Sequence, residues 1–297
     1  MSSSRSEKFL ALAALDYEGK SVEELKKLCG EFIGEGMHGL CFCPYLEGQK
    51  PGDQISEQQI RRRMEIIKPY TSWIRSFSCT EGNEAIPRIA REYGIKTMVG
   101  AWLGDDPDIN RGEIENLIEL AKEGFVGIAA VGNEVMLRGD LTEDELLNFM
   151  HQVKKAVPDV PVGYVDAYYE FAERPRIADA CDIILANCYP FWEGCDLDYS
   201  ILYMKDMYQK ALRAGNGKKV IISETGWPSQ GTNLEGAFPS HENLLKYYMS
   251  TQKWAKEDNI EIFYFSSFDE SWKVGAEGDV GAYWGLWDKD EKPKFVM

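Results

Sequence analysis

Short runs of apolar, mostly β-branched residues recur along the chain, and longer amphipathic or polar stretches separate them. We predict strands over residues 37–43, 73–78, 95–102, 126–131, 160–165, 183–187, 219–223 and 260–267. Near-continuous apolar runs are typical of strands buried on both faces, and parallel strands need long crossovers between them. This alternation constrains the fold more than any other feature, because it predicts a parallel sheet whose strands are joined by helices.

The stretches between the runs carry signals for helix starts. Ser21 with Glu24, and Thr142 with Glu145, have the spacing of a capping box, and Ser56 precedes a third amphipathic stretch. Together with the 3.6-residue periodicity, these signals predict helices over residues 22–33, 57–67, 110–122, 143–157 and 243–257.

Eight strand–helix units in 297 residues are the number expected for a single-domain α/β fold, the (β/α)8 TIM barrel. A doubly wound sheet is the alternative, but no GxGxxG fingerprint follows the first strand. We expect residues 1–20 to form an N-terminal extension and lead-in, and residues 21–297 to form the barrel that carries the site. In such a barrel the carboxyl ends of the strands form the functional face.

The charge balance excludes two classes of partner. Lys and Arg total 33 and Asp and Glu total 49, which gives a net charge of −16. Because such a surface repels phosphate backbones and anionic lipid, we expect neither nucleic acid nor membrane insertion. The only short apolar run near the N-terminus, residues 9–15, is followed by acidic residues and no cleavage site, so we interpret it as ordinary chain.

Cysteine and histidine usage argues against disulfides and metal. The seven cysteines are odd in number and irregularly spaced, which favours buried, reduced thiols over a disulfide framework. With only three histidines, no metal site is expected, and no motif indicates a cofactor.

Two apolar strands end in a glutamate. The run at 126–131 continues into Gly132, Asn133 and Glu134, and the run at 219–223 continues into Glu224. A carboxylate at the rim of an apolar strand costs desolvation free energy, so one such residue indicates an ion pair, a helix cap or a function. The fourth and seventh strands lie across a barrel mouth from each other, so both carboxylates can converge. Two convergent carboxylates with separated pKa values are what glycosidic-bond cleavage requires.

These motifs resemble glycoside hydrolase family 17, the β-1,3-glucanase family of the retaining 4/7 superfamily. The resemblance is carried by Gly-Asn-Glu at 132–134 and Ser-Glu-Thr-Gly-Trp-Pro-Ser at 223–229, and by the segments 73–77, 187–194, 268–273 and 280–286. It covers about residues 36–290. Cys43 departs from the serine expected before Pro44 and Tyr45, at a position that does not take part in the chemistry.

The resemblance implies roles for individual residues. Glu134 would be the acid/base and Glu224 the nucleophile. Asn133 would bond the sugar 2-hydroxyl, and its alternative is a turn asparagine. Tyr189 would hold Glu224 by a phenol hydrogen bond, and its alternative is a core tyrosine.

Further residues are candidates for substrate binding. Glu270 and Lys273 resemble a family pair near the acid/base, although an acid and a base three apart also form ordinary surface pairs. Arg75 and Asp166 could bond sugar hydroxyls, or pair with each other across the barrel mouth. Aromatic rings that stack on pyranose faces are expected at the rim, and at least two of the six should be packing residues. The six are Tyr45, Tyr168, Trp192, Trp227, Trp272 and Trp284.

The resulting hypothesis is a retaining hydrolase that cleaves β-1,3-glucosidic bonds in laminarin-type oligo- or polysaccharide by double displacement. A β-1,3-glucanosyltransferase with the same intermediate is the alternative, and a non-catalytic glucan-binding barrel is disfavoured because both glutamates are present. We expect a monomer without cofactor. The resemblance and the polymeric substrate imply a periplasmic or secreted enzyme, although the chain shows no clear signal peptide and its cysteines look reduced.

Overall fold

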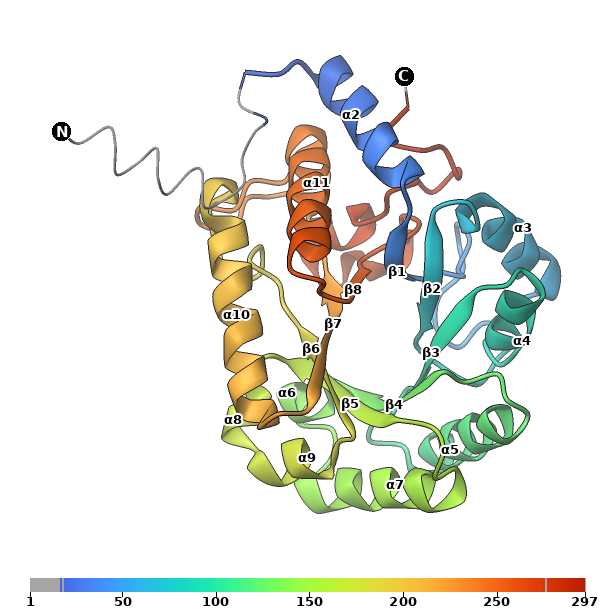
Figure 1. Ribbon diagram of the computed structural model, residues 1–297. Helices are drawn as coiled ribbons and strands as arrows, with labels where there is room; N and C mark the ends of the chain where they lie inside the picture. The colour runs from blue at the N-terminus through green and yellow to red at the C-terminus, as the bar shows by residue number, and fades with distance from the viewer. Residues whose placement is uncertain (1–16, 18, 276, 297) are drawn as a thin grey trace.

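The computed structural model describes residue 17 and residues 19–275 and 277–296, and its strands form one closed barrel in the order β1 to β8 (Figure 1). Every neighbouring pair is parallel, including β1 with β8. The (β/α)8 prediction is therefore confirmed. The strands are β1 Met37–Cys41, β2 Thr71–Ser76, β3 Lys96–Ala101, β4 Ile128–Asn133, β5 Val162–Ala167, β6 Ile183–Asn187, β7 Lys219–Thr225 and β8 Ile262–Tyr264.

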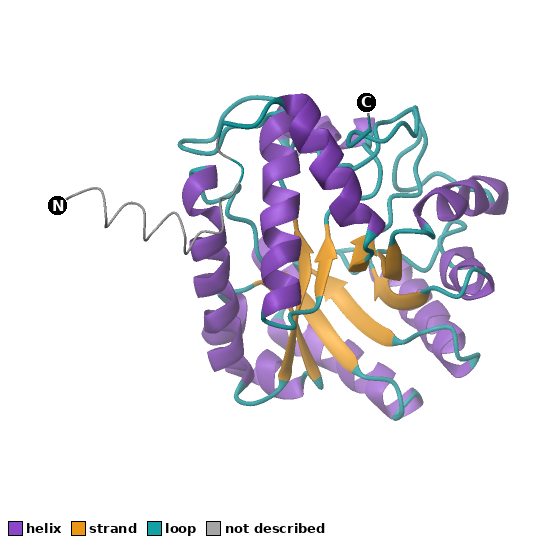
Figure 2. Cartoon of the chain, turned by 45° about the horizontal axis from the view of Figure 1, so that its top comes forward, coloured by secondary structure: helices purple, strands orange, loops and turns teal. Residues whose placement is uncertain are grey.

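Helices surround the barrel (Figure 2). The longer ones are α2 Val22–Gly34, α3 Glu57–Ile67, α4 Ala85–Glu92, α5 Pro107–Lys122, α7 Glu143–Ala156, α10 Ser200–Gly215 and α11 His241–Glu257. Short helices occupy the loops: α6 Val135–Arg138, α8 Glu170–Glu173, α9 Pro175–Ala180, and the 3-10 turns η1 Leu197–Tyr199, η2 Ser271–Val274 and η3 Gly278–Tyr283. Each of the five predicted helices is present, and α4 and α10 fill gaps for which the sequence analysis named no helix.

The predicted capping boxes form. Ser21 and Glu24 bond reciprocally at the start of α2, and Thr142 and Glu145 do so at the start of α7. Each box satisfies amide donors that a helix terminus leaves unpaired, which is why these local signals located the helix starts. The expected N-terminal extension and the apolar run 9–15 lie outside the described residues, apart from Tyr17, Gly19 and Lys20.

The eighth strand is shorter than the predicted run at 260–267. After Tyr264 the backbone leaves the strand ladder, and Phe265, Ser266 and Ser267 donate their amides to the carbonyls of residues 225, 284 and 41. These bonds tie the loop that follows β8 to β7, to the C-terminal part of the chain and to β1. Among the described residues, no helix is both long and apolar enough to cross a bilayer.

Candidate active site

The strand pairing is irregular at the ends of β4 and β7, where the two glutamates lie. The register between β4 and β5 shifts between Ala130 and Asn133, and the registers of β7 with both its neighbours shift near Glu224. Gly132 has a φ of 82°, and Glu134 has a φ of 52° in the left-handed region. A non-glycine residue there costs conformational free energy, and such residues cluster at functional sites. The local irregularities therefore present both glutamates at the mouth of the barrel.

Both glutamates line one cleft of about 530 Å³ at the carboxyl ends of the strands. Its wall combines carboxylates with aromatic and apolar side chains, as is usual for sugar-binding clefts. The lining residues are Glu134, Leu137, Ala167, Tyr168, Tyr169, Asn187, Tyr189, Trp192, Glu193, Glu224, Phe265, Glu277 and Trp284.

The carboxylate of Glu224 is buried and held at both oxygens. Arg75 Nη1 contacts Oε1 at 2.5 Å, and the phenol of Tyr189 donates to Oε2 at 2.7 Å. Arg75 is only 1% exposed, so this ion pair is shielded from water. The guanidinium and the phenol together fix the orientation of the Glu224 carboxylate.

Glu134 lies in contrasting surroundings, because no cation pairs with it among the described residues. Its Oε1 accepts a hydrogen bond of 2.8 Å from the amide of Asn187. Burial, followed by the negative charge of Glu224, raises the pKa of Glu134 to about 7. A carboxyl with that pKa holds its proton in slightly acidic solution and can donate it.

Hydrogen bonds connect the two carboxyl groups through their neighbours. Arg75 Nη2 donates to Asn133 Oδ1 at 2.7 Å, and Ser223 Oγ donates to Asn187 Oδ1 at 2.8 Å. Asn187 was not among the predicted site residues, although it begins the segment 187–194 that carried part of the resemblance. Its position at the carboxyl end of β6 is the signal that could have identified it.

Arg75 and Asp166 do not pair with each other. Arg75 binds Glu224 and Asn133, whereas Asp166 is fully buried and accepts hydrogen bonds from the Tyr164 phenol and the Ala167 amide. Burial raises the pKa of Asp166 to about 6. The structure thus places both side chains behind the cleft wall and away from its surface.

Glu270 and Lys273 form a buried ion pair of 2.9 Å, not a surface pair. The ammonium of Lys273 lies 4.2 Å from the ring centroid of Phe265, which lines the cleft. Glu270 Oε1 is buried without a hydrogen-bond partner among the described residues. Tyr45 and Trp272 contact each other edge-on at 6.0 Å, and Trp272 remains 38% exposed.

The six predicted aromatic residues occupy three kinds of position. Tyr168, Trp192 and Trp284 line the cleft, and Trp192 is 39% exposed, whereas Tyr45 and Trp272 are not part of its lining. Trp227 is fully buried, packs against Phe191 and Tyr247, and donates its indole N–H to the carbonyl of residue 238. The structure therefore places Trp227 in the core, away from the substrate contact expected for it.

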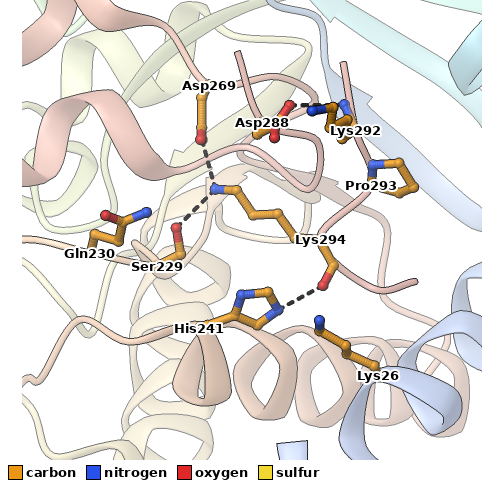
Figure 3. A pocket seen from close by; sticks show the side chains of 9 residues that line it. All are labelled: Lys26, Ser229, Gln230, His241, Asp269, Asp288, Lys292, Pro293 and Lys294. Carbon is orange, nitrogen blue, oxygen red and sulfur yellow. Dashed lines mark hydrogen bonds and ion pairs between the residues drawn. The ribbon is translucent and has the colours of Figure 1, made fainter. Parts of the chain in front are cut away.

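A second cavity of about 410 Å³ lies beside the C-terminal segment (Figure 3). Its buried ammonium, Lys294, donates to Asp269 and Ser229 at 2.8 Å, and His241 contacts the carbonyl of Lys294. These polar groups satisfy one another and join the chain end to the barrel. Among the described residues, no group of three or more potential metal ligands comes together.

Comparisons with known proteins agree with this fold. A family model described as "BtgE/BtgC glycoside hydrolase domain" matches residues 39–285. A glucan 1,3-beta-glucosidase of Arthroderma benhamiae is 27% identical over 271 residues, covering 83% of this chain and 87% of the relative. An active-site mutant of Rhizomucor miehei beta-1,3-glucanosyltransferase, in complex with laminaritriose, has a TM-score of 0.79 and 29% identity over 89% of this chain and 98% of that chain. A Formosa endo-laminarinase, at 19% identity and a TM-score of 0.73, shares the fold.

Proposed function

The chain belongs to glycoside hydrolase family 17, in its BtgE/BtgC branch, and on that premise we propose that it cleaves β-1,3-glucan with Glu134 as acid/base and Glu224 as nucleophile. The observation that carries this proposal is the contrast between a carboxyl that holds its proton and a carboxylate clamped by Arg75, both in one cleft.

In the first step, Glu134 donates its proton to the glycosidic oxygen while the Glu224 carboxylate attacks the anomeric carbon. The glycosidic bond breaks, the leaving chain departs with the proton, and a glycosyl ester forms on Glu224. Retaining enzymes of this kind hold the two carboxyl groups about 5 to 5.5 Å apart. Arg75 and Tyr189 orient the nucleophile for this attack.

Ester formation also prepares the second step. The charge on Glu224 contributes to the raised pKa of Glu134, and the ester has no such charge. The pKa of Glu134 therefore falls in the intermediate, so Glu134 can take a proton from the incoming hydroxyl. That hydroxyl attacks the anomeric carbon, the ester bond breaks, and Glu224 is regenerated.

The incoming hydroxyl can belong to water or to another glucan chain. Leu137, on the short helix α6 that follows Glu134, and Trp192, on the loop after β6, both line the cleft and are 49% and 39% exposed. Exposed apolar side chains in the cleft can hold an acceptor sugar, which favours transglycosylation as the second candidate. The Rhizomucor miehei neighbour is itself named a glucanosyltransferase.

Incubation with a laminari-oligosaccharide labelled at its reduced end tests both reactions. Shorter labelled products indicate cleavage, because both reactions release the labelled end when the glycosyl ester forms. Labelled products longer than the substrate indicate transfer, and shorter labelled products without longer ones indicate hydrolysis. Absence of any product from the wild-type chain would contradict both and leave only a glucan-binding barrel. We further propose that the barrel acts as a monomer outside the cytoplasm, since a polymeric glucan does not enter the cell.

A further inference from the structure

The cleft carries more negative charge than the reaction uses. Besides Glu134 and Glu224, the carboxylates of Glu193 and Glu277 line it, one on the loop after β6 and one on the loop after β8. Among the described residues, no lysine, arginine or histidine lines the same cleft.

The buried cations near the cleft already have partners. Arg75 pairs with Glu224, and Lys273 pairs with Glu270 at 2.9 Å. Burial raises the pKa of Glu277; of the charges around it, Lys273 favours the ionised form, whereas Glu224 and Glu270 oppose it. No described cation lies within ion-pair distance of Glu277, so its carboxyl group has no direct ion-pair partner.

Glu193 is likewise without a cation among the described residues. Its Oε2 accepts hydrogen bonds from the phenols of Tyr203 and Tyr168, the latter at 3.5 Å. Phenol hydrogen bonds hold a carboxylate in place but do not cancel its charge. Glu193 is solvent-exposed, whereas Glu277 is half-buried, so solvent screens the charge of Glu193 more strongly.

The hydrogen-bonding groups of the cleft wall also suit an uncharged ligand better than an acidic one. Ionised carboxylates only accept hydrogen bonds, which suits the O–H donors of sugar hydroxyls. A carboxylate on the ligand brings only acceptors and a like charge. Of the donors in this wall, the Asn187 amide and the Tyr189 phenol already bond Glu134 and Glu224. The buried Trp284 Nε1 has no partner among the described residues.

We propose that this cleft selects uncharged glucan and rejects glycans that carry carboxylates, with Glu277 as the main specificity-determining residue and Glu193 as the second. This inference rests on the proposed function and narrows its substrate class. It concerns charge and not size.

The test compares two derivatives of one polymer. Laminarin is oxidised at a small fraction of its primary hydroxyls to carboxylates, and part of that material is converted to the carboxamide. The two probes have equal size and degree of substitution and differ in charge. The value of kcat/KM at pH 7 and low ionic strength is measured for each probe and for unmodified laminarin.

We expect the wild type to cleave the carboxylate probe at least about 10-fold less efficiently than the carboxamide probe, a difference of roughly 1.4 kcal/mol. The ratio should shrink in high salt, because ions screen like-charge repulsion. Glu277→Gln should reduce the ratio more than Glu193→Gln, and the double variant should reduce it to about 3-fold or less.

A matched control separates local from overall charge. Glu115→Gln combined with Glu119→Gln changes the net charge by the same amount on the exposed face of α5, and it should leave the wild-type ratio unchanged. Equal cleavage of both probes by the wild type would overturn the proposal, and so would an undiminished ratio in the Glu193/Glu277 double variant. In either case, continued cleavage of unmodified laminarin leaves the proposed function standing.

Discussion

The carboxyl ends of β4 and β7 carry the same residue type in different surroundings. Glu224 is buried, pairs with the guanidinium of Arg75 and accepts a hydrogen bond from the Tyr189 phenol, so its orientation is fixed at both oxygens. Glu134 faces an amide and no cation among the described residues, and its pKa is raised to about 7. The difference teaches that neighbours, not residue type, divide the roles of acid and nucleophile.

Removal of either carboxylate should reduce activity more than any other change. Substrates with different leaving groups should distinguish the nucleophile from the acid/base. Glu224→Gln should reduce turnover of laminarin by at least roughly 10³-fold, because no glycosyl ester can form. Glu134→Gln should lose comparable activity on laminarin, but it should still release an activated aryl leaving group, which needs no proton. A pre-steady-state burst of aryl alcohol measures this release from an aryl glucoside substrate. A burst in Glu224→Gln would reverse the assignment.

Loss of Arg75 should weaken the fold as well as the site. Arg75→Met leaves the buried Glu224 carboxylate without its cation, and breaking a buried ion pair from one side costs about 3 to 5 kcal/mol. Urea unfolding measures the loss. The Arg75→Met/Glu224→Gln variant should recover part of it, because no uncompensated charge remains. Strict additivity of the two single changes would contradict the proposed coupling.

Tyr189→Phe should have an intermediate effect. It removes the hydrogen bond to Glu224 Oε2 and keeps the ring that packs against Phe265 and Trp284. Hydrogen bonds to charged groups contribute about 1.5 to 3 kcal/mol, so kcat should fall by about 10- to 100-fold. The thermal midpoint should also fall by a few degrees, because the same hydrogen bond contributes to stability. A fall in stability with unchanged kcat would identify Tyr189 as a packing residue only.

The smallest predicted effect is a change in the pH profile. The acid must be protonated, so kcat/KM should fall as the pH rises through the pKa of Glu134, about 7. The amide of Asn187 favours the ionised form of Glu134, so Asn187→Ala should raise this pKa and move the basic limb up by at most about one pH unit.

The change Asn243→Ala, on α11, is the control for this shift, because the amide of Asn243 bonds the carbonyl of residue 238. Its profile should match the wild type. Movement of the basic limb to lower pH in Asn187→Ala would contradict the role given to that amide.

Sequence reasoning located the strands well because most of them contain a run of consecutive apolar residues. It also located α2 and α7, because the two residues of each capping box are only three positions apart in the chain. It named no helix for 200–215, and it extended β8 to residue 267, where the backbone instead bonds three other segments. It proposed a sugar contact for Trp227, because a tryptophan after a strand looks alike whether it faces a cleft or the core.

The residues that surround the glutamates were harder to predict than the glutamates themselves. Arg75 and Asp166 were left with two alternatives, and the structure pairs Arg75 not with Asp166 but with Glu224. Glu193 and Glu277 line the cleft from loops, where no local pattern sets them apart from other polar residues, whereas Asn187 could have been identified from its position at the carboxyl end of β6.

The sequence by itself determined the barrel, its helix starts and the presence of a glutamate at the end of two strands, because each of these is encoded in neighbouring residues. Only the tertiary structure decided what those glutamates can do. Arg75 reaches Glu224 across 149 residues of chain, and Asn187 reaches Glu134 across 53. A pKa depends on burial and on the charges a few ångströms away, and those are set only when the strands close into a barrel.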